Sequence, residues 1–190
     1  AGEGTKIAAT FKNVPEDHTV TLNGIKVWED YDNLFSLRPT FPDGQSEMNK
    51  EEAEKQGLTL RLYRQADAQD GQDNAIPRTK VLPDESWTVT WEKGAEDNQW
   101  TYTITGTADS GELEAYAPNG MPWQYTVQEE LSGALKDIYT PRAGQVGEEG
   151  ERTEADGSFS ANMSQLTNSL EDSVSFSKAW EDQKENLITE

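Results

Sequence analysis

Apolar and polar residues alternate along several short stretches, and polar segments containing Gly and Pro separate these stretches. Alternation with a period of two residues is typical of half-buried β-strands. The clearest case is 58–64, where Leu58, Leu60 and Leu62 occupy every second position. The same pattern predicts strands at 20–30, 87–91, 100–106, 112–117, 123–130 and 159–168. The sequence therefore predicts an all-β domain.

The segments between these strands predict loops and one short helix. Residues 66–77 and 131–160 carry Gly and charged side chains throughout, which is typical of loops. The two Trp-rich strands at 87–91 and 100–106 predict a β-hairpin with a long loop. Residues 46–56 favour a helix that begins after Ser46 as its N-cap.

A Lys-x-Trp-Glu-Asp pattern occurs twice, starting at Lys26 and again at Lys178. A similar segment precedes each copy, with Asn13 before the first and Asn168 before the second. A repeated junction indicates an array of similar modules. We therefore expect three parts: the last strand and linker of a preceding repeat at 1–18, a complete domain at 19–170, and the first strand of a following repeat at 171–190.

Charge and composition exclude some classes of function. The chain has 36 acidic and 16 basic side chains and a formal net charge of -20, which repels nucleic acid and anionic membranes. Six Trp, six Tyr and five Phe within alternating strands indicate a packed core rather than disorder. No apolar run approaches the roughly 20 residues of a membrane helix. We therefore expect neither a nucleic-acid partner nor membrane insertion.

Two charged side chains fall within the apolar pattern. Lys26 alternates with apolar neighbours in the first strand, and such a lysine usually points to solvent. Glu129 shares one face of its strand with Trp123, Tyr125 and Val127. The alternative is that Glu129 lies just past the strand end and turns to water.

Five motifs, in order over residues 19–170, resemble the collagen-adhesin B-type (Cna B-like) repeats of Gram-positive surface proteins and pilins. They are Lys-Val-Trp-Glu-Asp at 26–30, Leu-Thr-Leu-Arg-Leu-Tyr at 58–63, Asn-Gln-Trp-Thr-Tyr at 98–102, Tyr-Thr-Val-Gln-Glu at 125–129 and Leu-Thr-Asn-Ser at 166–169. The resemblance implies a β-sandwich of immunoglobulin-like topology, of the reverse-immunoglobulin or prealbumin-like kind. It also implies an intramolecular isopeptide bond between the first and last strands.

Carried over to this sequence, the resemblance makes Lys26 the nucleophile, Asn168 the electrophile and Glu129 the catalytic acid. Burial lowers the pKa of a lysine and raises that of a carboxyl group, so both neutral forms become available. Glu130 takes the role of Glu129 if a bulge shifts the register. The chain departs from the family in its long insertions at 38–56 and 131–160, and in lacking an aromatic residue after the asparagine.

Asn13 and Lys178 are expected to be half-sites of the neighbouring repeats. Each lacks its own carboxylate and its own partner strand within the chain. Pairing of Asn13 with Lys178, within one molecule or between copies, is the alternative.

The resemblance implies a structural stalk or spacer in a cell-surface adhesin or pilus-like protein, outside the cell and anchored to the cell wall. Its partners are then the neighbouring repeats, and bond formation happens once per molecule rather than as enzymatic turnover. Neither a signal peptide nor a sorting tail is visible, as expected of a piece of a longer polypeptide. The alternative function is a ligand-binding adhesin module that recognises a host protein or glycan through its loops.

No cofactor or metal is expected from the sequence. The only histidine, His18, is predicted to lie on a surface linker, and one histidine excludes multi-histidine metal sites. The acidic segment 29–33 lacks EF-hand spacing and is expected to be a solvated loop rather than a Ca²⁺ site. Carboxylate pairs of the glycosidase kind arise by chance among so many acidic residues, and no pattern selects one.

Overall fold

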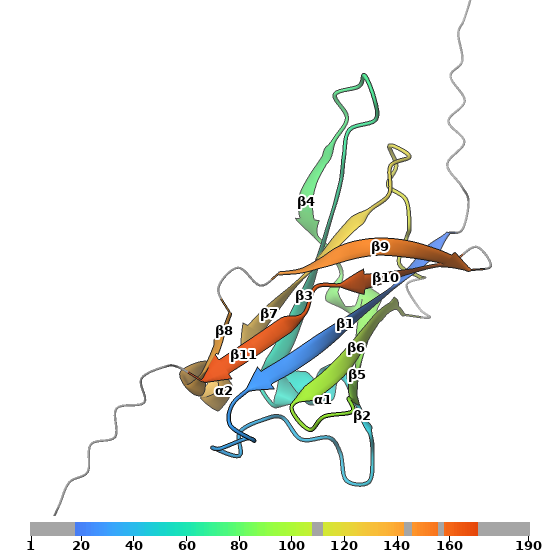
Figure 1. Cartoon of the computed structure of the whole chain (residues 1–190). Coiled ribbons are helices and arrows are strands. Elements are labelled where there is room, and N and C mark those ends of the chain that lie inside the picture. Colours follow the sequence, from blue (N-terminus) through green and yellow to red (C-terminus); the bar gives the residue numbers. More distant parts are fainter. Residues whose placement is uncertain (1–17, 108–111, 143–145, 156–157, 171–190) are drawn as a thin grey trace, which may run out of the picture.

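The computed structural model describes residues 18–107, 112–142, 146–155 and 158–170 (Figure 1). Within these residues the chain is built mainly from strands. They are β1 (Thr19–Glu29), β2 (Glu47–Asn49), β3 (Leu58–Ala66), β4 (Ile76–Lys80), β5 (Trp87–Lys93), β6 (Gln99–Gly106), β7 (Gln124–Leu131), β8 (Tyr139–Pro141), β9 (Gly147–Ala155), β10 (Ser158–Met163) and β11 (Leu166–Leu170). Two short helices, α1 (Lys50–Lys55) and α2 (Gly133–Ile138), and the 3₁₀ turn Asp84–Ser86 complete the described part. The prediction of an all-β chain is confirmed.

Strand β1 is the centre of the larger group of strands. It pairs antiparallel with β6 on one side, and β5 and β2 follow β6 outward. On its other side, β1 pairs parallel with β10 along its first half and with β11 along its second half. Because one strand is held on both sides over most of its length, β1 fixes the position of every side chain it carries.

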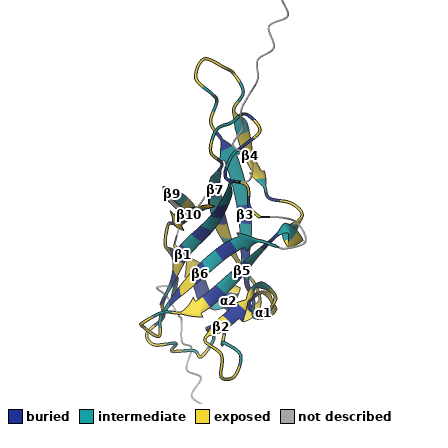
Figure 2. Cartoon of the chain, turned by 90° about the vertical axis from the view of Figure 1, so that its right-hand side faces the viewer, coloured by how far each residue is buried: buried dark blue, intermediate teal, exposed yellow. Residues whose placement is uncertain are grey.

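Strands β7, β3 and β4 form a second layer, and β9 connects it to the first by pairing with both β10 and β7. Figure 1 shows β3 and β7 behind β1, β6 and β11. Buried residues alternate with less buried ones along both layers (Figure 2), as expected when two sheets enclose one core. The result is a β-sandwich-like fold with one continuous apolar core.

Several predicted elements are confirmed. Strand β3 buries Leu58, Leu60 and Leu62, and β5 and β6 form the expected antiparallel hairpin. Helix α1 lies within the predicted segment, but Asn49 rather than Ser46 is its N-cap. The Asn49 side chain accepts from the Glu52 backbone N–H while Glu52 accepts from the Asn49 N–H, a reciprocal pair that a serine three residues earlier cannot make.

The predicted strand at 112–117 is wrong. Residues 114 and 116 make only isolated bridges, to Thr19 and Pro122 respectively. Val20 N–H donates to the Leu113 carbonyl and Ala115 N–H donates to the His18 carbonyl, and these two bonds form the single bridge to the start of β1. On its other side the segment bonds to 121–123, with Trp123 N–H donating to the Ala115 carbonyl, so it pairs with each neighbour over too few residues to form a ladder.

The prediction that 131–160 is loop-rich is also wrong, because this segment contains α2, β8 and β9. Strand β9 has the sequence Gly-Glu-Glu-Gly-Glu-Arg-Thr-Glu-Ala, without apolar alternation. It forms because β10 and β7 offer hydrogen-bond partners on its two sides. The predicted loop at 66–77 likewise ends early, at the start of β4.

The predicted single strand at 159–168 is in fact two strands, β10 and β11. Between them, Ser164 N–H donates to the Glu148 carbonyl of β9 at 2.9 Å instead of to β1. Along β10, Leu22 lies opposite Ala161, whereas along β11 Trp28 lies opposite Asn168. The break therefore advances the register against β1 by one residue.

Gly24 is required by the packing of β1 on β6. A Cβ atom at this position would lie 2.1 Å from Cζ of the buried Tyr102, which is opposite Gly24 in the register. We expect Gly24→Ala to lower the free energy of unfolding by at least about 2 kcal/mol, because this overlap exceeds the small gain of replacing a strand glycine. Urea unfolding measures the effect.

The control is Thr21→Ala, on the same strand but outside the contact with Tyr102. It should cost less than about 1 kcal/mol. Equal losses in the two variants would contradict the role assigned to Gly24.

Candidate functional site

Lys26, Glu129 and Asn168 converge in the interior of the fold. Lys26 comes from β1, Asn168 from the adjacent β11, and Glu129 from β7 in the other layer. Lys26 and Asn168 are fully buried, and the side chain of Glu129 is 4% exposed. The expectation that Lys26 points to solvent is therefore wrong, and so is the alternative in which Glu129 turns to water.

The register break between β10 and β11 places Asn168 in this group. Even-numbered residues of β1 face the core, as the burial of Leu22, Lys26 and Trp28 shows. A shift of one residue exchanges the two faces of a strand. Continued in the register of β10, β11 would set Thr167 opposite Trp28; the extra residue sets Asn168 there instead, on the same face as Lys26.

One carboxylate contacts both of the other side chains. Glu129 Oε2 lies 3.1 Å from Lys26 Nζ, and Glu129 Oε1 accepts a hydrogen bond of 2.5 Å from Asn168 Nδ2. Apart from this ion pair, Lys26 Nζ has no hydrogen-bond partner among the described residues, and neither has Asn168 Oδ1. Buried polar atoms normally have such partners, so the group is polar but incompletely satisfied.

Burial lowers the pKa of Lys26 from 10.5 to about 8, although the charges of Glu129 and Asp30 oppose this shift. Desolvation penalises an ammonium group more than its neutral amine. Nζ also lies 4.5 Å from the centre of the Trp28 ring. The surroundings of Lys26 thus make its neutral amine available near neutral pH.

The pairing of β7 with β3 determines which of Glu129 and Glu130 faces the core. This register is continuous from Leu58 opposite Leu131 to Gln65 opposite Gln124, without a bulge. Glu130 therefore faces outward, where it accepts a hydrogen bond from Arg61 Nε at 3.0 Å. Only Glu129 of the two reaches Lys26 and Asn168.

Sequence reasoning missed a second buried group beside the first. Asp30 is 1% exposed and pairs with Arg38 through two hydrogen bonds, and the Tyr139 hydroxyl donates to its Oδ2 at 2.8 Å. These bonds outweigh burial and hold the pKa of Asp30 below its usual value. The expectation that 29–33 is a solvated loop is therefore wrong for Asp30. Its only sequence signal was its place after Lys-x-Trp-Glu.

Aromatic rings connect the two groups. The Trp28 ring contacts Tyr139 with ring centres 5.1 Å apart and Trp100 at 5.3 Å, in edge-on arrangements. The hydroxyl of Tyr102 is buried without a hydrogen-bond partner in the described part of the chain, and burial, followed by the charge of Glu129, raises its pKa. This surrounding wall keeps water away from Lys26.

The other predicted site residues have different outcomes. Asn13 and Lys178 lie outside the described residues, as do most of the proposed flanking repeats. His18 is half-buried rather than on the surface, with its ring 5.9 Å from Tyr116 and 5.5 Å from Phe159. Within residues 18–170, as far as they are described, no group of three or more His, Cys, Asp or Glu side chains is placed to hold a metal.

Comparisons with protein-family models, with curated proteins and with solved structures found no match. In the described ranges, no helix is both long enough and apolar enough to span a membrane. The candidate site must therefore be interpreted from its own geometry.

The lowered pKa of Lys26 predicts a specific dependence of stability on pH. The variant Asn168→Ala removes the carboxamide with which the Lys26 amine could react. In its folded state the pKa of Lys26, about 8, lies below the unfolded value of 10.5. Between these values the unfolded state binds more protons, so stability should rise with pH, by up to about 3 kcal/mol. Urea unfolding at pH 8.0 and 10.5 measures this rise.

The comparison is Asn168→Ala combined with Lys26→Met, which removes the titrating amine and leaves the tyrosines in place. Its stability should lack this rise. The same pH dependence in both variants would show that Lys26 has an ordinary pKa.

Proposed function

We propose that the chain is a structural stalk or spacer module of a cell-surface adhesin or pilus-like protein, stabilised by an isopeptide bond between Lys26 and Asn168. The observation that carries this proposal is the buried contact of one carboxylate, Glu129, with both an amine and a carboxamide. The neighbouring repeats of the same polypeptide are its proposed partners, and the immunoglobulin-like topology belongs to the same proposal.

A purely structural role explains the buried group less well. Removing an ammonium and a carboxylate from water costs several kcal/mol for each ion, and such a pair rarely stabilises a fold more than apolar side chains would. Here the cost is compounded because Lys26 Nζ and Asn168 Oδ1 lack further hydrogen bonds in the described structure. Conversion of the amine into an amide removes the buried positive charge.

The contacts support a balanced reaction. The Lys26 ammonium first passes a proton to Glu129 Oε2, 3.1 Å away, which leaves a neutral amine and a carboxylic acid. The amine then attacks Cγ of Asn168 to form the C–N bond. The attacking nitrogen loses one proton, which Glu129 relays to the amide nitrogen; the bond from Cγ to Nδ2 then breaks and ammonia leaves, while Glu129 remains a neutral carboxylic acid. No other reactant is needed, and fixed positions replace a high reactant concentration.

The two oxygens of Glu129 fit the two stages of this sequence. While Glu129 is ionised it can only accept, and Asn168 Nδ2 donates to Oε1. Once Glu129 carries the proton of Lys26 it becomes a donor, and rotation of the amide turns Oδ1 towards it. That hydrogen bond polarises the carbonyl and gives the unpartnered Oδ1 a donor at the stage when its carbon is attacked.

The position of the bond suits a module that carries tension. Strand β1 begins at one end of the fold and β11 ends at the other (Figure 1), and the two strands run parallel where they pair. A pull on the two ends of the module would therefore shear β1 against β11. A covalent bond from β1 to β11 carries that load directly, so the hydrogen bonds of the layers between them carry little of it.

The intact mass of the denatured chain tests bond formation. We expect a deficit of about 17 Da, the mass of one ammonia, because amide formation expels the Asn168 nitrogen. Lys26→Met, Asn168→Ala and Glu129→Ala should each restore the full mass. Glu130→Gln is the matched control and should keep the deficit, since Glu130 faces outward to Arg61. A full mass for the unmodified chain would refute the bond.

Single-molecule pulling between the ends of the chain tests the mechanical role. The bond encloses roughly 140 residues, which cannot extend while it is intact, whereas Asn168→Ala should release a contour length on the order of 500 Å. The control Glu130→Gln should resist extension as the unmodified chain does. If the unmodified chain lengthens as much as Asn168→Ala, it carries load through hydrogen bonds alone.

A further inference from the structure

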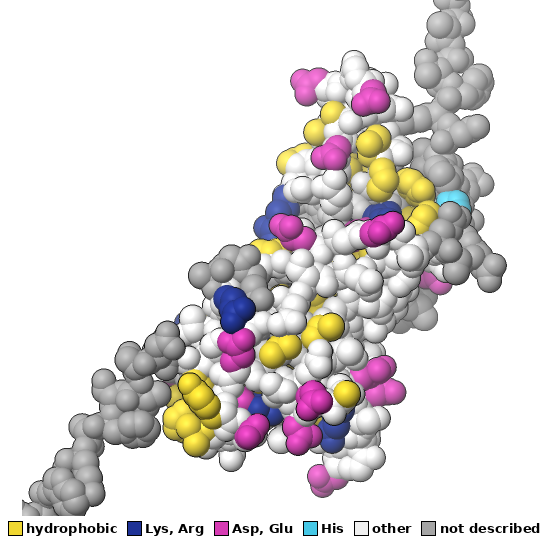
Figure 3. Space-filling model, viewed as in Figure 1, with side chains coloured by type: hydrophobic (Ala, Val, Ile, Leu, Met, Phe, Trp, Pro, Cys, Tyr) yellow, Lys and Arg dark blue, Asp and Glu magenta, His cyan; other side chains and the backbone are white. Residues whose placement is uncertain are grey.

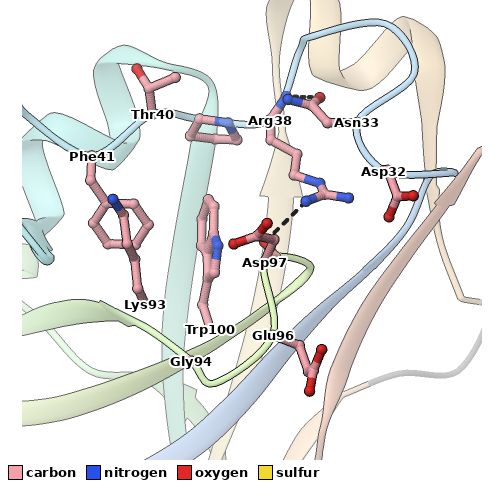
Figure 4. A pocket seen from close by; sticks show the side chains of 11 residues that line it. Asp32, Asn33, Arg38, Thr40, Phe41, Lys93, Gly94, Glu96, Asp97 and Trp100 are labelled. Carbon is pink, nitrogen blue, oxygen red and sulfur yellow. Dashed lines mark hydrogen bonds between the residues drawn. The ribbon is translucent and has the colours of Figure 1, made fainter.

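A cavity of about 490 Å³ opens at the end of the molecule where β1 finishes. It lies between the loop that follows β1, at 32–41, and the turn between β5 and β6, at 93–97 (Figure 4). We call it the acidic pocket. Lys26, Glu129 and Asn168 do not line this pocket, so the role of the pocket does not depend on the isopeptide bond.

The charge of the acidic pocket is negative. Arg38 forms part of its wall, but two hydrogen bonds to the buried Asp30 neutralise this guanidinium. Asp32, Glu96 and Asp97 are exposed at the pocket and form no ion pair with any residue in the described ranges. Figure 4 shows Asp32 and Asp97 on either side of the Arg38 side chain. Lys93 also lines the pocket, so the three carboxylates exceed its one cation without an ion pair in the described ranges, and the pocket keeps a net negative charge.

The other side of the acidic pocket is aromatic. The ring of Phe41 contacts that of Trp100 edge-on, with ring centres 5.0 Å apart. Lys93 Nζ lies 5.3 Å from the centre of the Phe41 ring, so this wall already accommodates a cation (Figure 4). An aromatic face beside carboxylates suits a long cationic side chain, whose apolar stem packs while its charged end is paired.

The adjoining turn presents two large apolar side chains to solvent. Tyr31 is 82% exposed and Leu34 is 60% exposed, directly before and after the pocket residues Asp32 and Asn33. Tyr31, Asp32 and Asn33 all have positive φ angles, between 51° and 60°, which is costly for residues other than glycine. Asp30 holds this turn by accepting from the Asn33 N–H with its side chain and from the Leu34 N–H with its carbonyl.

We propose that the acidic pocket binds a lysine or arginine side chain of a partner polypeptide. The volume exceeds that of one long side chain and leaves room for the adjoining backbone. Exposed Tyr31 and Leu34 offer apolar contact to the rest of such a partner, which a free amine would not use. Acidic side chains gather over this end of the molecule (Figure 3), and the net charge of -20 attracts a basic partner over a longer range.

Titration of the full chain with N-acetylarginine methylamide, followed by amide NMR shifts, tests the proposal. We expect saturable shifts confined to 30–41 and 93–100. N-acetylcitrulline methylamide, which has the same shape without the charge, should bind at least tenfold more weakly. The triple variant Asp32→Asn, Glu96→Gln, Asp97→Asn should weaken arginine binding by about tenfold or more.

A second triple variant, Glu54→Gln, Glu85→Gln, Glu151→Gln, removes the same number of exposed charges elsewhere and should leave the affinity unchanged. Equal weakening by both triple variants, or shifts spread over the whole surface, would reduce the effect to general attraction and overturn the proposal. Stronger shifts at the pocket with methyl glucoside than with the arginine probe would assign the pocket to a glycan instead. Absence of saturable shifts with the arginine probe would refute binding of a cationic side chain.

Discussion

The burial of Lys26 against Glu129 is the constraint on which the rest of the structure depends. A buried ion pair between two sheets, with few further hydrogen bonds, is costly to maintain. The aromatic wall of Trp28, Trp100 and Tyr102 excludes water from it, and β1 is held by strands on both sides. The unfavourable burial of these charges has a chemical use if Lys26 reacts with Asn168, because the amide that forms carries no charge.

The topology of β1 links the two sites that we describe. Its inward face carries Lys26. Asp30 directly follows the last residue of β1 and makes the buried contact with Arg38 and Tyr139. Arg38 in turn donates to the carbonyl of Asp97 at 3.0 Å, in the wall of the acidic pocket. One network of charged groups therefore anchors the loop that shapes the pocket, and the aromatic contact between Tyr139 and Trp28 joins that network to the site at Lys26.

The parts of the fold that were predictable are those with strong local patterns. The alternation of leucines in β3 and the Trp-rich hairpin depend on residues close in sequence, and the common face of Glu129 and Val127 follows from period two. Strand β9 was missed because its sequence is polar on both faces and its ladder partners are distant. The one-residue register break before Asn168 was likewise invisible, because pairing with β1 defines it.

The candidate site was reached by resemblance to a family, not by periodicity alone. The pattern favoured a solvent-facing Lys26, and only the tertiary structure shows that this side chain is fully buried. Asp30, Arg38 and Tyr139 were not recognised as a group because 109 residues separate Asp30 from Tyr139 and no motif joins them. Long-range pairing of single polar residues leaves little trace in one sequence.

A crystal structure at atomic resolution tests the central claim most directly. We predict continuous electron density between Lys26 Nζ and Asn168 Cγ, at the length of an amide C–N bond, about 1.3 Å, with the original amide nitrogen of Asn168 gone. Separate density for an ammonium group and an intact carboxamide at van der Waals distance, in protein kept folded at neutral pH, would contradict it.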